Sequence, residues 1–292
     1  MTNSDQAQAT VGIIGGSGLY DLEGVKDIAE VRLDTPFGAP SDVFMVGTLG
    51  DERVAFLPRH GRGHRVTPTD LNNRANIFGF KLLGVQRLIS VSAVGSMREE
   101  IAPLDIVIPD QLFDRTTQRV NTFFGGGIVG HVGFADPFCP SLSARIADAS
   151  EKSGARVHRG GTYVCIEGPQ FSTKAESRIY RSWGVDIIGM TAIPEAKLAR
   201  EAEMCYATIA LVTDYDVWHT SSAAVTVEMV VANLLKNVTI ARAILSYAVP
   251  GIGNAPPCTC QDALKDAIMT SSHLIPESTR RDLAPLIQRY FD

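Results

Sequence analysis

Two aspartates about three-quarters of the way along the chain, Asp214 and Asp216, stand one residue apart just beyond the apolar run 206–212. Alternate residues beyond a strand point the same way, so both carboxylates can face one ligand. They lack the histidines and further carboxylates of a metal site. They are also too close in sequence to flank a sugar as a glycosidase pair does. Two explanations remain. The structural one is that the pair forms a turn. The chemical one is that the pair binds a flat heterocycle such as adenine, which has N7 and the N6 amino group on neighbouring edges.

Four separate segments can offer hydrogen-bond donors to an anion. They contain Ser17 in the run GGSG, Arg59 and His60 in LPRHGRGH, Ser92 and Ala93 in SVSAVGSM, and Thr191 before an expected helix N-terminus. Helix N-termini favour negative charge. Each segment alone is also typical of a turn or a solvated loop, and GGSGLYDLEG fits neither G-x-G-x-x-G nor G-x-S-x-G. Together, with no acidic cluster that would bind Mg²⁺, they favour inorganic phosphate over a nucleoside triphosphate.

Short apolar runs alternate with longer helical patterns, and these elements must position the polar groups. Strands are predicted at 11–14, 43–49, 53–57, 87–93, 105–109, 162–166, 185–188 and 206–212. Helices are predicted at 67–84, with Thr67 as N-cap, and at 140–154, 173–184, 193–204 and 225–248. Most strands are apolar on both faces, so we expect an α/β domain with a mixed, largely parallel sheet flanked by helices. The loop 121–140, rich in glycine and phenylalanine, is long enough for a lid or an interface segment.

The composition limits the partners. The chain has 292 residues, of which 45% are hydrophobic and 20% charged, and its net charge is −5 without a basic run. Nucleic acid is therefore not an expected partner. No apolar stretch approaches the roughly 18 residues of a membrane helix, and MTNSDQAQAT does not resemble a signal peptide. We expect a cytoplasmic protein with a disordered tail at 1–10 and one domain at 11–292.

Five cysteines are scattered through the chain, a pattern unlike the disulfide framework of a secreted protein. Cys258 and Cys260 stand one residue apart in PPCTCQD. Ordinary thiols are the favoured interpretation, and a C-x-C disulfide is the alternative for a protein of thermophilic origin. Two cysteines alone do not predict a metal site.

Several longer motifs resemble those of the trimeric purine nucleoside phosphorylase family, and within it the branch that cleaves methylthioadenosine. They are IIGGSGLY, PRHGRGH, NNRANIF, IEGPQFSTKAES, GMTAIPEAKLAREAEMCYA and TDYDVW. The resemblance covers about residues 11 to 250 in unbroken order. It implies a twisted mixed β-sheet surrounded by helices, with the active site near a subunit interface of a homotrimer or, in some members, a hexamer.

The resemblance also implies a role for each matching residue. Phosphate would be held by Ser17, Arg59, His60, Ser92, Ala93 and Thr191. The ribose would contact Met190, and the purine would stack on Phe171 beside Ile166, with Asp214 and Asp216 at its N7 and N6 edge. The 5′ group would occupy an apolar slot of Val227, Val230 and Val231, closed by His131 and Leu274 from a neighbouring subunit.

The implied reaction is phosphorolysis of 5′-methylthioadenosine to adenine and 5-methylthioribose 1-phosphate, a pentosyl transfer in purine and methionine salvage that needs no cofactor or metal. Asp214 would protonate N7 as general acid, its pKa raised by burial and a nearby carboxylate. Asp216 would accept a hydrogen bond from N6. Family members that cleave 6-oxopurine nucleosides carry Asn and Glu in place of Asp214 and Ser172.

There are two alternatives to this reaction, one of them another enzyme and the other a protein without catalytic activity. One is a 6-oxopurine nucleoside phosphorylase, against which Asp214 and Ser172 speak. The other is a catalytically silent nucleoside-binding or scaffold protein. Such a protein should have lost Arg59 or the aspartate pair, and all three residues are present.

Overall fold

Two long parallel strands, β5 (Arg87–Ser96) and β11 (Cys205–Asp214), form the middle of the sheet. The structure is a computed structural model and describes residues 8–16, 19, 24–219 and 227–291. Every residue of β11 is buried, as expected for a strand covered on both faces. Cys205 begins β11 beside Arg87, and Asp214 ends it beside Gly95. Both strands therefore bring their carboxyl ends to the same edge of the sheet.

The other strands extend this centre into a mixed sheet of eleven strands within the described residues. Next to β5 lie β1 (Val11–Gly15) and β4 (Glu52–Pro58), both parallel, followed by β3 (Phe44–Leu49) and β2 (Val25–Val31), both antiparallel. The carboxyl end of β5 pairs with β10 (Ile187–Gly189), which continues to β9 (Thr162–Ile166) and β7 (Gln111–Arg115). The far side of β11 pairs with β6 (Ile106–Ile108), which pairs with β8 (Val157–Arg159).

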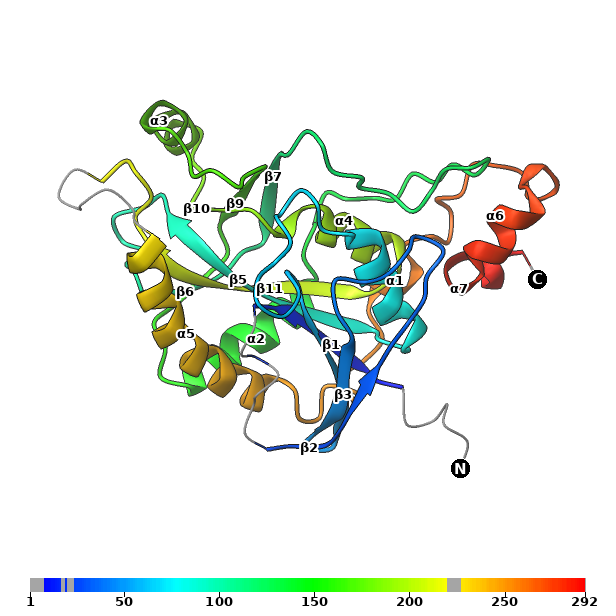
Figure 1. Ribbon diagram of the computed structural model, residues 1–292, viewed down its shortest axis with the longest axis horizontal. Coiled ribbons are helices and arrows are strands. Elements are labelled where there is room, and N and C mark those ends of the chain that lie inside the picture. The colour runs from blue at the N-terminus through cyan, green and yellow to red at the C-terminus, as the bar shows by residue number, and fades with distance from the viewer. Residues whose placement is uncertain (1–7, 17–18, 20–23, 220–226, 292) are drawn as a thin grey trace.

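Helices cover both faces of this sheet (Figure 1). On one face, α1 (Asn73–Leu82) and α4 (Ala192–Glu201) share a core with Tyr206 of β11. On the other face, α2 (Pro140–Lys152) and α5 (Val227–Ala248) share a core with residues that alternate with Tyr206 along the strand. The α3 helix (Lys174–Ser182) lies at one end of the molecule, and α6 (Glu277–Asp282) and α7 (Ala284–Ile287) lie near the C-terminus.

The eight predicted strands are all present, and the predicted helices are confirmed within a few residues except at the start of the first. Thr67 is not its N-cap. Asn72 caps α1 by accepting a hydrogen bond from the Ala75 N–H at 3.2 Å. Thr67 instead bonds the Asp70 carboxylate at 2.6 Å in the preceding turn. The strands that the sequence did not predict, β2, β7 and β8, are mostly exposed or only three residues long, so their apolar signal is weak.

The predicted tail lies mostly outside the described residues, but its last two residues are part of the fold. The Ala9 N–H donates to the Leu83 carbonyl oxygen at 2.8 Å, and the Thr10 N–H donates to that of Arg53 at 3.0 Å. Ala9 is buried. The structured chain therefore begins before residue 11. Within the described residues, no helix is long and apolar enough to cross a membrane.

Much of the long loop 121–140 pairs with the C-terminal segment. The His131 N–H donates to the Ala267 carbonyl oxygen, and the Met269 N–H donates to that of Val129. The Thr279 hydroxyl of α6 bonds the Gly126 carbonyl oxygen at 2.6 Å. The loop 121–140 and the C-terminal segment thus form one lobe. Figure 1 places this lobe beside α6, away from the carboxyl ends of β5 and β11.

Candidate active site

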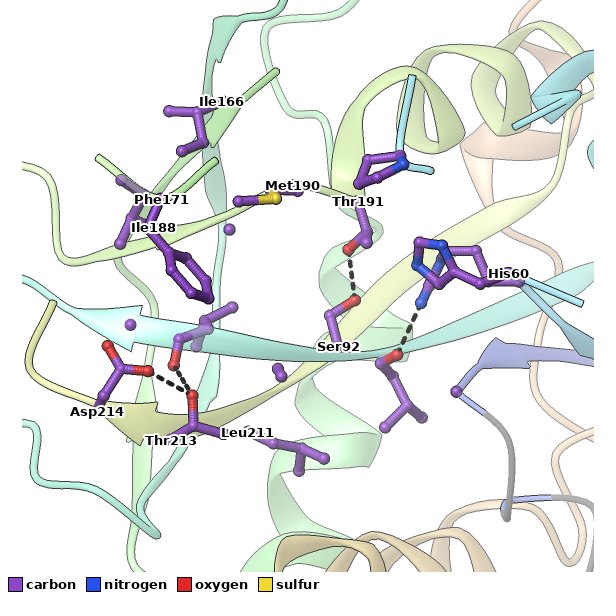
Figure 2. A pocket seen from close by; sticks show the side chains of 18 of the residues that line it. His60, Ser92, Ile166, Phe171, Ile188, Met190, Thr191, Leu211, Thr213 and Asp214 are labelled. Carbon is purple, nitrogen blue, oxygen red and sulfur yellow. Dashed lines mark hydrogen bonds between the residues drawn. The ribbon is translucent and has the colours of Figure 1, made fainter. Parts of the chain in front are cut away.

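A cavity of about 530 Å³ opens where β1, β4, β5 and β11 end. Such strand ends are the usual ligand site of α/β sheets, and the volume is typical of a small-molecule pocket. Its wall is completed by the segments that follow β9 and β10. Figure 2 shows hydroxyl and imidazole groups toward one end of the cavity and Asp214 at the other. The cavity is thus long and has two chemically different ends.

Ser92, Thr191 and His60 form the first end. The Ser92 and Thr191 hydroxyl oxygens are 2.7 Å apart, and Ala93 lines the cavity beside them. Thr191 is the N-cap of α4, but its side chain caps no backbone N–H. Ile193 is extended, with φ −108° and ψ 131°, so the regular helix starts beyond it. The hydroxyl of Thr191, rather than the helix dipole, is therefore the group that this segment offers to an anion.

Arg59 lines the cavity but is 2% exposed, and its guanidinium group is held by Glu195. Nε lies 2.5 Å from one carboxylate oxygen of Glu195, and Nη2 lies 3.2 Å from the other. Nη2 also lies 2.7 Å from the Ser90 hydroxyl oxygen. The bidentate contact that a guanidinium group can make with an anion is therefore made with Glu195. Nη1 donates to the Val91 carbonyl oxygen at 3.0 Å, and it has no second acceptor among the described residues.

His60 carries no charge at neutral pH. Burial, and then the positive charge of Arg59, lower its pKa to about 4. Its Nδ1 lies 2.9 Å from the Val66 carbonyl oxygen, and a carbonyl oxygen can only accept, so Nδ1 bears the proton. Nε2 is then an acceptor. A phosphate oxygen that meets Nε2 must bring a proton, or His60 must become protonated when the anion binds.

Asp214 and Asp216 form the second end, and both are 7% exposed. One Asp214 oxygen accepts the Asp216 N–H at 2.8 Å, and the other lies 2.7 Å from the Thr213 hydroxyl oxygen. Asp216 has φ +49°, a backbone conformation that redirects its side chain after the strand. Its Oδ2 is buried without a hydrogen-bond partner among the described residues. The predicted pair therefore lines one cavity and leaves an acceptor available to a ligand.

Burial raises the pKa of both carboxyl groups. For Asp214 the effect is opposed by hydrogen bonds from Thr213 and from the Asp216 N–H. The Thr213 hydroxyl has one proton and two acceptors in reach, Asp214 Oδ2 at 2.7 Å and the Val94 carbonyl oxygen at 3.2 Å. When the hydroxyl donates to Val94, its oxygen can accept a hydrogen bond from protonated Asp214. The site thus accommodates Asp214 in both protonation states, as a general acid requires.

Gly95 leaves the space that Asp214 occupies. A Cβ atom at position 95 would lie 2.9 Å from Asp214 Oδ1 and 3.1 Å from Ile188 Cγ2. Both distances are too short for an unstrained side chain, so the carboxylate position depends on a glycine in the neighbouring strand. This role of Gly95 depends on contacts with Asp214 and Ile188 that no local sequence pattern indicates.

Apolar side chains line the cavity between its two ends. Phe171, Ile166 and Met190 lie there as predicted, and Ile188 joins them (Figure 2). Phe171 is 47% exposed, so part of its side chain is accessible to a ligand. Val231 of α5 also lines the cavity. These residues can bind a flat ring and an apolar substituent.

Five predicted site residues do not appear in this cavity. Ser17 and the side chains of Val227 and Val230 lie outside the described residues. His131 and Leu274 belong to the lobe beside α6, and both are exposed. Within one chain they do not line the cavity. Their predicted role therefore stays a prediction that needs a second subunit.

Arg119 is a positioning residue that the sequence did not reveal. Its side chain is 2% exposed and pairs with Glu167, with Nε and Oε1 3.0 Å apart. Its Nη atoms donate to the carbonyl oxygens of Ile166, Met190 and Ile193. One guanidinium group therefore fixes the two segments that carry the apolar wall. The only sequence signal is an arginine in a polar loop, which is too common to predict this role.

A possible metal site lies elsewhere. Within the described residues, the one group of His, Cys, Asp or Glu side chains with metal-like spacing consists of cysteines, and none of them lines the cavity. At the first end, the Ser92 and Thr191 hydroxyl groups are the donors that can face an anion.

Comparison with known proteins agrees with this geometry. The family model of the phosphorylase superfamily matches residues 10–250, so the chain belongs to that superfamily. Among curated relatives, the S-methyl-5′-thioadenosine phosphorylases of Koribacter versatilis and Geobacter sulfurreducens are 58% and 57% identical to it. Each alignment spans 284 residues, or 97% of this chain, and covers 97% and 99% of the two relatives.

Solved structures give the same answer. A methylthioadenosine phosphorylase from an Antarctic soil metagenomic library superposes with a TM-score of 0.92 at 48% identity, covering 96% of this chain and 99% of the other. The Schistosoma mansoni methylthioadenosine phosphorylase in complex with adenine has a TM-score of 0.83 at 37% identity, with 94% and 100% covered. The expected family and fold are confirmed.

Proposed function

We propose that this protein is a pentosyltransferase that cleaves 5′-methylthioadenosine with inorganic phosphate, releasing adenine and 5-methylthioribose 1-phosphate. One observation carries the proposal: a single cavity has a buried aspartate pair at one end and hydroxyl and imidazole groups at the other. An apolar wall with an accessible aromatic side chain lies between them. The names of the relatives support the same substrate.

The purine end favours an aminopurine over a 6-oxopurine. Asp214 and Ser172 both line the cavity, where the oxopurine branch of the family carries Asn and Glu. The Ser172 hydroxyl is buried without a hydrogen-bond partner among the described residues, which leaves it for a ligand. The Asp216 oxygen without a partner can accept from the N6 amino group. A 6-oxopurine presents a carbonyl oxygen at that place and would meet a carboxylate.

In the proposed reaction, a phosphate oxygen attacks C1′ while the bond from C1′ to N9 breaks. The electron pair of that bond passes to the purine, and Asp214 donates its proton to N7, so neutral adenine leaves. The sugar passes through a state with oxocarbenium character. Met190 lies between the two ends of the cavity, where the ribose would be held (Figure 2).

The assembly, location and cofactor requirement are parts of this proposal. We infer a homotrimer, in which His131 and Leu274 reach the cavity of the adjacent subunit. The exposure of Val129, Met269 and Leu274 on the lobe supports a contact surface there. The reaction as proposed needs no cofactor, because phosphate is the second substrate, and a role in purine and methionine salvage places the enzyme in the cytoplasm.

The test is release of adenine from methylthioadenosine, with and without phosphate and with and without a chelator. Cleavage should require phosphate, should be unaffected by brief chelator treatment, and should give stoichiometric 5-methylthioribose 1-phosphate. Equal adenine release in phosphate-free buffer would indicate a hydrolase. A higher kcat/KM for inosine or methylthioinosine than for methylthioadenosine would favour the oxopurine alternative.

A further inference from the structure

Four cysteines that are far apart in sequence form a cluster outside the active site. The Sγ atoms of Cys139, Cys205, Cys258 and Cys260 all lie within 4.8 Å of one another. Cys139, Cys205 and Cys260 are 0%, 1% and 3% exposed, and Cys258 is half-buried. This cysteine cluster contains four of the five cysteines in the chain.

Three elements bring the cluster together. Cys139 is the N-cap of α2, Cys205 is the first residue of β11, and the other two lie in the segment that follows α5. The Cys139 N–H donates to the Tyr206 carbonyl oxygen at 2.8 Å, which fixes the start of α2 against the start of β11. The C-terminal segment then adds Cys258 and Cys260 from one side. Sequence spacing gives no hint of this meeting, which depends on tertiary structure.

The sulfur spacing fits a metal tetrathiolate better than a disulfide. In a Zn²⁺ site with bonds of about 2.3 Å, neighbouring sulfurs are about 3.8 Å apart, whereas a disulfide bond is about 2.05 Å long. The Cys139 and Cys258 sulfurs lie 3.5 Å apart, and all four thiols are free. The C-x-C disulfide that the sequence allowed is therefore not present.

A hydroxyl group lies beside two of the sulfur atoms. The Ser141 hydroxyl lies 3.2 Å from Cys139 Sγ and 4.0 Å from Cys258 Sγ. Donors of this kind, at the start of a helix, resemble the outer-shell contacts that orient and stabilise metal-bound thiolates.

We propose that Cys139, Cys205, Cys258 and Cys260 bind one structural Zn²⁺ ion. Four thiolates complete a tetrahedral shell, which leaves no open position for substrate or water. Near-complete burial of three ligands is typical of such a closed site. Softer thiolate ligands also select zinc over Mg²⁺ or Ca²⁺, which prefer oxygen.

The site would tie the C-terminal segment to the core. Cys205 and Asp214 occupy opposite ends of β11, so the cluster and the aspartates are about 30 Å apart along the strand. Zinc should therefore affect stability and leave the chemistry of the active site unchanged. Its folding contribution would arise because the unfolded chain has no preformed set of four thiols.

The first experiment is metal analysis of the wild-type protein, purified under reducing conditions without an affinity tag that binds metal. We expect about one zinc ion per chain, released only when a mercurial reagent blocks the thiols. Replacement by Co²⁺ should produce the visible ligand-field bands and the near-ultraviolet thiolate charge-transfer bands of a tetrahedral tetrathiolate. These measurements do not depend on any variant or on catalytic activity.

The second experiment compares two cysteine substitutions. Cys258→Ser removes the half-buried ligand, the one whose replacement disturbs packing least, and should abolish stoichiometric zinc and lower Tm by roughly 5–10 °C. Cys165→Ala is the matched control. Cys165 is buried in another core cluster, so the Cys165→Ala protein should keep its zinc. At a temperature well below Tm, the catalytic rate of Cys258→Ser should match that of the wild type.

Three outcomes would overturn the proposal. Wild-type protein with no bound metal and five titratable thiols would leave the cluster as ordinary packing. Fewer than five thiols in denaturant with chelator would indicate a disulfide. Iron at stoichiometric level, with visible absorbance in the isolated protein, would contradict the assignment to zinc.

Discussion

At the scale of single residues, Asp214 is the group on which the proposed chemistry depends. It is buried, its pKa is raised by that burial, and its neighbour Thr213 can stabilise it with or without a proton. In the proposed reaction Asp216 is the acceptor rather than the acid, because one of its oxygens lacks a partner among the described residues. The two aspartates therefore have different environments despite equal burial, and different roles follow from that.

Asp214→Asn should reduce kcat/KM for methylthioadenosine by about 10²–10⁴-fold, the usual contribution of a general acid. The amide keeps the size and can still donate to N7, so binding of adenine should change less than turnover. A variant that retains full turnover would mean that Asp214 only terminates the strand. Adding Ser172→Glu should shift the preference from methylthioadenosine toward methylthioinosine, measured as the ratio of kcat/KM values.

The pH profile tests the same residue independently. A general acid must be protonated, so wild-type kcat/KM should fall as pH rises through the raised pKa of Asp214. In Asp214→Asn this fall should be absent, while any change due to phosphate ionisation remains. An identical basic limb in both proteins would assign it to another group.

Arg59 has a structural role that must be separated from phosphate binding. Arg59→Met leaves the buried Glu195 carboxylate without its partner, which should cost about 3–5 kcal/mol of stability. Arg59→Met/Glu195→Gln removes the charge and should restore most of that loss, because Tyr206 and Ser90 can still bond the side chain. The phosphate KM should stay raised in the double variant. A normal phosphate KM in a folded double variant would show that Arg59 serves Glu195 alone.

At the scale of elements, the site depends on how closely β5 approaches the end of β11. The register shifts between Val212 and Asp214, next to Gly95 of β5. This irregularity and the missing side chain together bring the Asp214 carboxylate over the neighbouring strand. Arg119 fixes the opposite wall by bonding the backbone after β9 and after β10. Catalytic geometry is thus set by backbone contacts between elements as much as by the reacting side chains.

Gly95→Ala should displace Asp214 while the fold persists. The added Cβ would lie 2.9 Å from Asp214 Oδ1. Because a misplacement of about 1 Å can cost about 100-fold, kcat/KM should fall by up to that factor, with a smaller change in Tm. Ile188→Ala in the same background removes the second close contact. If the double variant recovers activity, crowding by Ile188, and not displacement of Asp214, was the cause.

At the scale of the whole molecule, the loop 121–140 and the C-terminal segment form one lobe that faces away from the cavity of its own chain. Its exposed apolar side chains include Leu274 at 64% and Met269 at 67%. Such exposure is typical of a contact surface. A closed ring of subunits would bury it and would bring His131 to a neighbouring cavity.

Mixed oligomers test this arrangement. His131→Ala and Asp214→Asn should each lower activity alone. When both are produced in one cell, a subunit with intact Asp214 can receive His131 from its neighbour, so the mixture should exceed the sum of the two separate proteins. No gain in the mixture, or a monomer by light scattering, would contradict a shared site.

The sequence alone was enough for eight of the eleven strands among the described residues, the main helices, the aspartate pair and part of the cavity lining. Hydrophobic periodicity is a local property, and the polar residues of a ligand site follow the ends of strands. Short sequence segments are therefore enough to predict strands, helices and these polar residues. The long motifs added the family, which the comparisons confirmed. The N-cap of α1 was misplaced because Thr67 and Pro68 carry the same local signal as a true helix start.

Tertiary structure decided the contacts between distant segments. Arg59 meets Glu195 across 136 residues of sequence, and Arg119 bonds four carbonyl groups that no sequence pattern connects to it. The cysteine cluster is the clearest case: the sequence showed Cys258 and Cys260 as a pair, and only the fold added Cys139 and Cys205. Composition and spacing cannot predict such contacts, because the contacts depend on how distant segments pack against one another in the folded protein.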